Sequence, residues 1–82
     1  MGYNSKAEYD AAAKEFVNMY KGDSKSEIFE GVWNGKGQLN GTTQIVIRNG
    51  GKQVIIDKST GQIIDFYQGT ELKGLINVRQ VQ

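Results

Sequence analysis

Three short runs rich in isoleucine and valine dominate the middle of the chain, between residues 42 and 67. Two turn signals separate these runs, Asn49-Gly50-Gly51 and Lys58-Ser59-Thr60-Gly61. Glycine reaches positive φ at little steric cost, so the first signal suits a tight hairpin and the second a longer hairpin loop with a bulge. Strands joined this closely must run antiparallel, because a parallel crossover needs about a dozen residues or more. The sequence therefore predicts an antiparallel meander that the rest of the chain covers or extends.

The segment before the meander predicts one amphipathic helix over residues 5–21. Ser5-Lys6-Ala7-Glu8 is a capping-box pattern, in which the Ser5 hydroxyl accepts a hydrogen bond from the amide of Glu8. Gly22 is of the residue type that commonly ends a helix. Apolar residues recur at helical spacing and form one face, which comprises Tyr9, Ala12, Ala13, Phe16, Met19 and Tyr20.

Alternation along the three runs gives the predicted sheet two unlike faces. The face expected to meet the helix carries Ile45, Ile47, Val54, Ile56, Ile64 and Phe66. The other face mixes Val46, Ile55 and Ile63 with Arg48, Asp57, Asp65 and Tyr67. That face is too polar for a core and too apolar for open water, so we expect it to be half covered or curved into a cleft.

Two further segments extend the sheet. Residues 27–33 lack clean alternation and fit either a strand or a short second helix, and Val32 and Trp33 favour the strand. Residues 75–81 alternate again and predict the last strand. We therefore predict a single α+β domain over residues 1–82. Its N-terminal helix packs on a curved antiparallel sheet of four to five strands.

Composition narrows the chemistry that the chain can perform. It has neither histidine nor cysteine, so it lacks the commonest general base, the commonest metal ligand and any thiolate site. We expect no metal and no cofactor. A net charge of +1 argues against a strongly basic nucleic-acid binder. Residues 1–31 carry four lysines against six acids, whereas residues 32–82 carry six basic residues against three acids. No apolar run approaches the length of about 18 residues that spans a bilayer.

RNA cleavage remains open to a chain without histidine. The phosphorane needs a cation, and the 2′-hydroxyl and the leaving oxygen need groups that accept and donate protons. The candidate catalytic residues are Arg48, Lys52, Asp57, Thr60 and Tyr67, and the candidate RNA-binding residues are Thr43, Lys36 and Arg79. In this hypothesis Arg48 or Lys52 stabilises the developing charge. Asp57 or Tyr67 handles the proton, and Thr60 orients a phosphate oxygen.

Each of these candidates also has a purely structural interpretation. Arg48 and Lys52 flank a hairpin and fit solvated edge charges, while Asp57 fits a turn-starting residue that bonds its own loop. Tyr67 fits a half-buried sheet aromatic. Lys36 lies in a glycine-rich stretch, residues 34–41, that lacks the spacing of a phosphate-binding P-loop. The stretch is expected to be a long loop, and a contact of Lys36 with a phosphate-containing partner is the alternative.

A family resemblance gives the cleavage hypothesis its context. Residues 11–16, AAAKEF, followed by Asn49-Gly50 and by residues 54–61, VIIDKSTG, resemble C-terminal toxin modules of bacterial polymorphic and contact-dependent growth inhibition systems. Such modules have the barnase, EndoU, colicin and RelE-like ribonuclease fold. The resemblance implies a small metal-independent ribonuclease toxin that cuts tRNA or other RNA. It also implies secretion or delivery into the target-cell cytoplasm, with neutralisation by an acidic cognate immunity protein.

Two other function classes fit the same sequence. One is a non-enzymatic protein-binding module, such as a phage-type inhibitor or an immunity-like protein, which the mild charge and the missing histidine favour. The other is a structural domain of a larger surface protein. We expect no membrane partner, and we expect a monomer or a heterodimer with an inhibitor.

Overall fold

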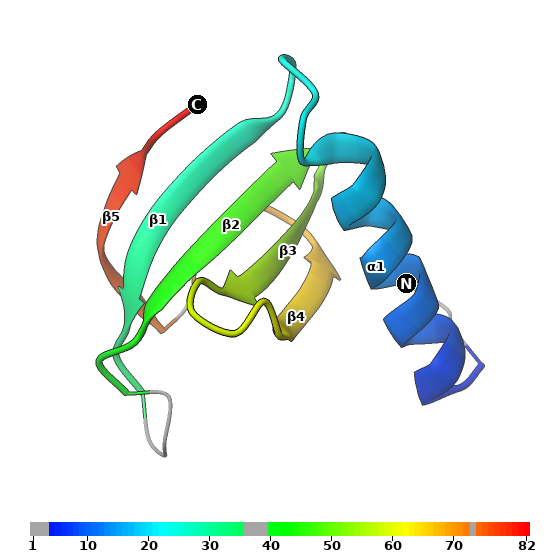
Figure 1. The fold of residues 1–82 in the computed structure, drawn as a ribbon, viewed down its shortest axis with the longest axis horizontal. Coiled ribbons are helices and arrows are strands. Elements are labelled where there is room, and N and C mark those ends of the chain that lie inside the picture. Colours follow the sequence, from blue (N-terminus) through cyan, green and yellow to red (C-terminus); the bar gives the residue numbers. More distant parts are fainter. Residues whose placement is uncertain (1–3, 36–39, 73) are drawn as a thin grey trace.

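The computed structural model describes residues 4–35, 40–72 and 74–82. Over these residues one helix packs on a five-stranded antiparallel sheet that is not closed (Figure 1). The elements are α1 (Lys6–Tyr20), β1 (Glu27–Trp33), β2 (Thr43–Asn49), β3 (Lys52–Asp57), β4 (Ile63–Gln68) and β5 (Leu75–Gln80). This architecture confirms the predicted α+β class. It also shows that residues 27–33 form a strand rather than a second helix.

The helix begins where the capping pattern predicts. Ser5 is the N-cap, and its hydroxyl accepts from the amide of Glu8 at 3.2 Å. Ala13 and Phe16 are its buried residues, whereas Met19 is 57% exposed. The expectation that Met19 shares the core-facing side is wrong. A helix turns by about 100° per residue, so Met19 lies about 120° around the axis from Ala13.

The tight turn between β2 and β3 is built as the sequence predicts. Gly50 and Gly51 both have positive φ, at 60° and 80°, and Asn49 pairs with Lys52 across the turn. Two successive left-handed residues are typical of the two-residue hairpin whose twist matches that of the flanking strands.

The sheet combines a meander with one returning strand. Its order is β4-β3-β2-β1-β5, so consecutive strands pair from β1 to β4 and the last strand pairs with the first. Gln68 at the end of β4 lies opposite Lys52, at the start of β3. Leu75 at the start of β5 lies opposite Trp33, at the end of β1. The link between β4 and β5 therefore runs from one end of the sheet to the other.

A β-bulge in the pairing of β3 with β4 changes which isoleucine faces the helix. Ile56 pairs with Ile63 and Ile55 pairs with Asp65, so Ile64 is the extra residue. Ile63 packs against the helix-side cluster, and Ile64 packs on the opposite face. The predicted assignment of these two isoleucines is therefore wrong, because simple alternation does not hold across a bulge.

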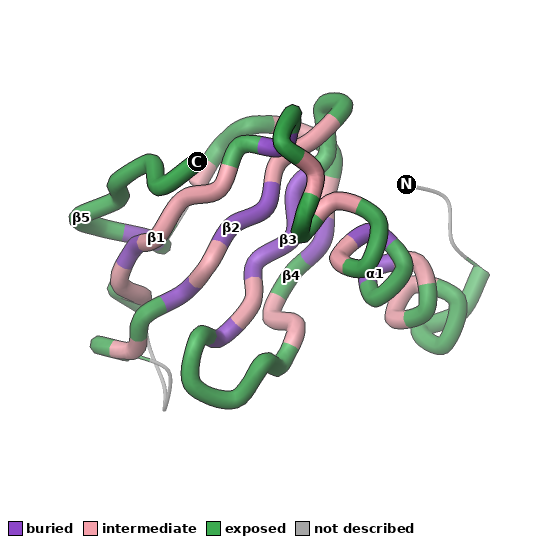
Figure 2. Tube along the Cα trace, turned by 45° about the horizontal axis from the view of Figure 1, so that its top comes forward, coloured by how far each residue is buried: buried purple, intermediate pink, exposed green. Residues whose placement is uncertain are grey.

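Each face of the sheet carries its own apolar cluster. On the helix side the buried residues are Ala13, Phe16, Ile47, Val54 and Phe66. On the opposite side Val46, Ile55 and Leu75 are buried, with Phe29, Trp33, Ile64, Tyr67 and Leu72 packed against them. The buried positions follow β2, β3 and β4 in the centre of the molecule (Figure 2). The second face is half covered, as expected, and Leu72 of the β4–β5 link contributes to that cover.

Candidate functional site

The sequence-predicted residues fall into separate groups in the structure. Arg48 and Tyr67 meet through Gln53, which is fully buried. Arg48 Nε donates to Gln53 Oε1 at 2.9 Å, and Gln53 Nε2 donates to the Tyr67 hydroxyl at 2.8 Å. Arg48 Nη2 also donates to the carbonyl of Thr70 at 3.0 Å, and its guanidinium lies 4.6 Å from the centre of the Phe29 ring. These contacts fasten the β4–β5 link to the sheet.

Tyr67 completes this network. Its hydroxyl donates to the carbonyl of Glu71, which also accepts from Gln53 Nε2 at 2.7 Å. Burial raises the pKa of Tyr67 above its ordinary value of 10.0. A phenol with a raised pKa stays protonated at neutral pH and remains a donor in the network.

Asp57 lies at the other end of β3 and organises the loop that follows it. Its Oδ1 accepts from the Ser59 hydroxyl at 2.7 Å and from the amides of Ser59 and Thr60 at 2.9 and 3.2 Å. Its Oδ2 accepts from Gln44 Nε2 at 3.1 Å. The hydrogen bond from the Ser59 hydroxyl is the main cause that lowers the pKa of Asp57 below its ordinary value. This geometry matches the structural interpretation of Asp57, in which it starts the turn and accepts hydrogen bonds from its own loop.

These two groups are too far apart to hold one phosphate together. The Arg48 and Tyr67 group lies at the start of β3, where Gln53 follows Lys52, and Asp57 is the last residue of the same strand. A strand rises about 3.3 Å per residue, which puts about 17 Å between Lys52 and Asp57. Thr43 lies at the Asp57 end, where its carbonyl accepts from the amide of Lys58 at 3.1 Å. Lys36 lies outside the described residues.

Arg79 belongs to the face that carries α1. It pairs with Glu30 across β1 and β5, and its Nη2 donates to Glu30 Oε2 at 3.2 Å. Glu30 lies opposite Ile45, a residue that packs against the helix-side cluster. Lys58 Nζ lies 2.7 Å from Glu30 Oε1, and its hydrogen bond is the main cause that lowers the pKa of Glu30. Arg79 therefore does not join Arg48 and Tyr67 on one face.

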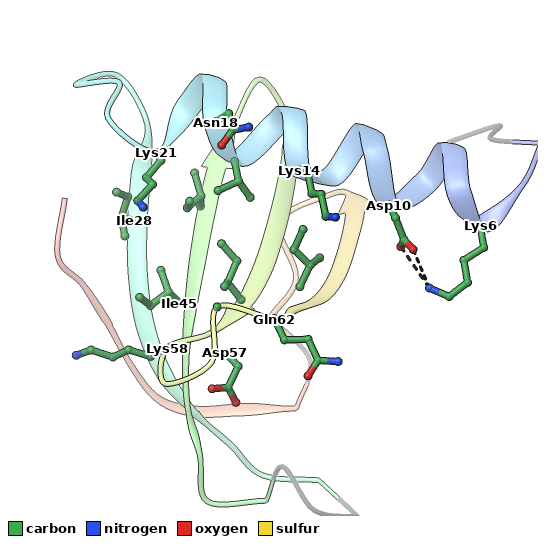
Figure 3. Close-up of a pocket in the computed structure, with 15 residues that line it drawn as sticks. Lys6, Asp10, Lys14, Asn18, Lys21, Ile28, Ile45, Asp57, Lys58 and Gln62 are labelled. Atoms are coloured by element: carbon green, nitrogen blue, oxygen red, sulfur yellow. Dashed lines mark hydrogen bonds and ion pairs between the residues drawn. The ribbon is translucent and has the colours of Figure 1, made fainter.

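A groove of about 860 Å³ separates α1 from the uncovered part of the sheet (Figure 3). Five isoleucines from strands β1 to β4 line it, together with Val17 of the helix, and four lysines contribute to its lining. Apart from buried Ile47, these isoleucines are only partly buried. The isoleucines are Ile28, Ile45, Ile47, Ile56 and Ile63, and the lysines are Lys6, Lys14, Lys21 and Lys58. The groove is therefore apolar on the sheet side, and its charged lining consists of these four lysines and two carboxylates, Asp10 and Asp57.

The lysines of the groove differ in their partners. Lys6 pairs with Asp10 at 3.0 Å, and Lys58 pairs with Glu30. Within the part of the chain that the structure describes, Lys14 and Lys21 form no ion pair. Both project from α1 on the side of the strands (Figure 3). The spacing of residues 6, 10, 14, 18 and 21 places polar side chains along one helical stripe, a signal that the sequence contained.

A smaller pocket of about 480 Å³ lies on the opposite face of the sheet. It is lined by Trp33, Ile55, Asp65, Tyr67, Gln68, Gly69 and Glu71. Its apolar lining comes from two aromatic side chains and one buried isoleucine, and two carboxylates belong to its polar lining. Trp33 both packs against the apolar cluster of this face and lines the pocket.

No protein-family model, no curated protein and no solved structure matches this chain. Among residues 4–35, 40–72 and 74–82, no three carboxylates come together as a metal site. The helix in the described part of the chain is too short and too polar to cross a membrane.

Proposed function

We propose that this chain is a protein-binding module whose α1–sheet groove receives an acidic segment of a partner protein. The observation that carries the proposal is the pairing of half-buried isoleucines with a lysine rim in one groove. Exposed apolar surface of this kind is typical of interaction sites. Lys14 and Lys21 select for acidic residues around the apolar contacts, because complementary charge guides partner choice and association rate.

The groove favours a protein over RNA as its occupant. Single-stranded nucleic acid is held by basic residues together with aromatic side chains on which bases stack. The described groove residues supply lysines but no aromatic ring. Isoleucines stabilise aliphatic and aromatic side chains of a partner by about 25 cal/mol per Å² of apolar surface removed from water, a gain that a phosphate backbone does not provide.

A synthetic helical peptide tests the proposal directly. The probe carries leucines at helical spacing on one face and glutamates elsewhere, and its binding is followed by fluorescence anisotropy. We expect Lys14→Glu with Lys21→Glu to weaken binding about tenfold or more, because two attractive contacts become repulsive. Lys25→Glu makes the same substitution at an exposed residue outside the groove lining and serves as the control that matches the charge change of each single variant, Lys14→Glu or Lys21→Glu. Equal binding of a serine-for-leucine peptide would contradict the proposal, because charge alone would then suffice.

A metal-independent ribonuclease toxin is the second candidate function. The lysines of the groove favour it, because they can neutralise phosphates, and so does the resemblance to toxin modules. In this case the chain cuts tRNA after delivery into a target cell and is neutralised by an acidic immunity protein. Because Arg48, Asp57 and Tyr67 hold the fold together through hydrogen bonds, Lys14 becomes the better candidate for stabilising the phosphorane.

An RNA cleavage assay separates the two functions. The folded chain is incubated with total RNA and with tRNA in EDTA, beside Lys14→Ala and Arg48→Ala, and the RNA is run on a gel. The ribonuclease candidate requires cleavage in EDTA that Lys14→Ala reduces by about 10²–10³, the effect of removing one group that stabilises the transition state. Intact RNA with folded wild-type protein leaves the protein-binding module as the function.

A further inference from the structure

We propose that the pocket lined by Trp33 and Tyr67 binds a guanidinium group, as presented by an arginine side chain of a partner protein. This site lies on the face of the sheet opposite the α1–sheet groove, and it does not depend on what occupies that groove. Three properties suit the pocket to such a ligand, namely its aromatic lining, its fixed shape and its charge.

The apolar lining of the pocket suits a flat cation. Trp33 and Tyr67 are its aromatic residues, and Ile55, which is 2% exposed, closes it toward the core. A cation over an aromatic face gains about 0.5–1 kcal/mol when exposed and about 2 kcal/mol when desolvated. The guanidinium group is planar and weakly hydrated, so it stacks on aromatic rings better than an ammonium group does.

The pocket is held in shape before any ligand arrives. The Tyr67 hydroxyl is fixed between Gln53 Nε2 and the carbonyl of Glu71, and Arg48 ties the same link to the sheet through Thr70. A ligand that enters a fixed pocket avoids the cost of ordering its walls. The volume of about 480 Å³ lies within the range typical of small-ligand sites.

The charge of the pocket selects a cation. Asp65 and Glu71 both contribute to its lining, whereas none of the described lining residues is a lysine or an arginine. Asp65 Oδ1 accepts from its neighbouring backbone amide at 2.8 Å and from the Tyr9 hydroxyl at 3.1 Å, which orients the carboxylate. Arg48 lies close enough to Tyr67 to act on it electrostatically, and its Nε and Nη2 donate to Gln53 and to the carbonyl of Thr70. A carboxylate accepts a guanidinium through two parallel hydrogen bonds, a geometry that an ammonium cannot match.

The sole tryptophan of the chain makes the pocket directly observable, because its fluorescence reports on Trp33 alone. The protein is titrated with N-acetyl-arginine methylamide and with the corresponding citrulline and lysine compounds. We expect the arginine compound to bind about tenfold or more tightly than the citrulline compound, which keeps the shape and loses the charge. The lysine compound should fall between them. Free arginine is included as a separate arm, and tighter binding of free arginine than of the blocked compound would assign the site to a small molecule instead of a protein side chain.

Variants show whether the carboxylates act in binding. Asp65→Asn and Glu71→Gln should each weaken binding of the arginine compound about threefold to tenfold, the range expected for a charge pair close to solvent. Glu15→Gln removes a carboxylate from the exposed side of α1 and should leave binding unchanged. Circular dichroism confirms that each variant is folded. Equal responses to the arginine and citrulline compounds, or unchanged affinity in both pocket variants, would overturn the proposal.

Discussion

Replacing Gln53 with leucine tests whether the buried network, rather than the sheet alone, holds the pocket face together. Gln53 is fully buried and makes three side-chain hydrogen bonds, to Arg48 Nε, the Tyr67 hydroxyl and the carbonyl of Glu71. Leucine has nearly the same volume and keeps the apolar contacts of the side chain. The Gln53→Leu variant therefore removes the hydrogen bonds and little else.

The expected cost follows from what each partner loses. A hydrogen bond contributes about 0.5–1.5 kcal/mol, or about 1.5–3 kcal/mol when one partner is charged, as Arg48 is here. Tyr67 and Glu71 keep the bond that joins them, and the partly exposed Arg48 regains water, which offsets part of the loss. We expect a destabilisation of about 2–4 kcal/mol, a large share of the roughly 4–12 kcal/mol typical of a domain of this size.

Gln44 offers a matched control on the same face of the sheet. It is also fully buried, and its Nε2 donates to Thr42 Oγ1 and Asp57 Oδ2, but its buried Oε1 has no hydrogen-bond partner among the residues that the structure describes. Gln44→Leu loses two bonds and removes an unsatisfied oxygen that costs about 1–3 kcal/mol, so its net effect should be about 0–2 kcal/mol. Urea unfolding followed by circular dichroism measures both variants. A Gln44→Leu variant that is less stable than Gln53→Leu would refute this reasoning.

Three further predictions concern the fold. Phe16→Ala should lower the free energy of unfolding in urea by about 3–5 kcal/mol, because Phe16 is only 6% exposed and its ring centre lies 5.1 Å from that of Phe66. A near-neutral effect would place Phe16 outside the core. Gly50→Val should cost about 1–2 kcal/mol from backbone strain alone, since φ is 60° and no atom of the described residues lies within 4 Å of its Cβ position. An unchanged urea midpoint would contradict this. The free energy of unfolding should fall as the pH drops through 4.5 and 3.8, the ordinary pKa values of Glu30 and Asp57. Folding lowers the pKa of both carboxyl groups, so the unfolded chain binds protons at a higher pH than the folded chain does. A urea midpoint that increases as the pH is lowered from 6 to 3 would contradict this prediction.

The features that the sequence predicted well are local. Gly50 and Gly51 define a turn within four residues, and Ser5 caps a helix through the amide only three residues away. Alternation then assigns most strand residues to a face without knowledge of distant contacts. The helix, the meander and most of the helix-side cluster follow from these short-range rules, and the structure confirms them except at Met19 and Ile64.

Two features of the fold depend on pairing that no short-range pattern records. The turn signal at residues 58–61 predicted a bulge, but the position of that bulge at Ile64 arises from the register between β3 and β4, and it reverses the faces of Ile63 and Ile64. The return of β5 to β1 brings Leu75 beside Trp33, which lies more than forty residues earlier in the chain. This return also carries the β4–β5 link across the sheet, where it forms part of the pocket. The sequence did not predict the pocket, because the pocket depends on the course of the β4–β5 link across the sheet.

The candidate site was predicted only in part, because residue type does not show with which groups a side chain forms its hydrogen bonds. Arg48 and Tyr67 do share a face, as predicted, but both bind the β4–β5 link. Asp57 bonds its own loop, which was the structural alternative considered from the turn sequence. Gln53 was overlooked, since a glutamine in a strand gives no signal that it will be buried at the centre of a network.

Charge along the sequence proved a poor guide to charge on the surface. The first 31 residues carry more acids than lysines, yet three of the four groove lysines, Lys6, Lys14 and Lys21, come from them. The more basic remainder supplies Asp65 and Glu71, both carboxylates of the opposite pocket. Helical spacing collects these lysines along the side of α1 that lines the groove, next to the face that packs on the strands, and the bulge and the link bring the two carboxylates to the other face of the sheet. A chain with a net charge of +1 can therefore present a cationic groove and an anionic pocket on opposite sides of one sheet. The two proposed ligands, an acidic segment and a guanidinium group, follow from this separation by face.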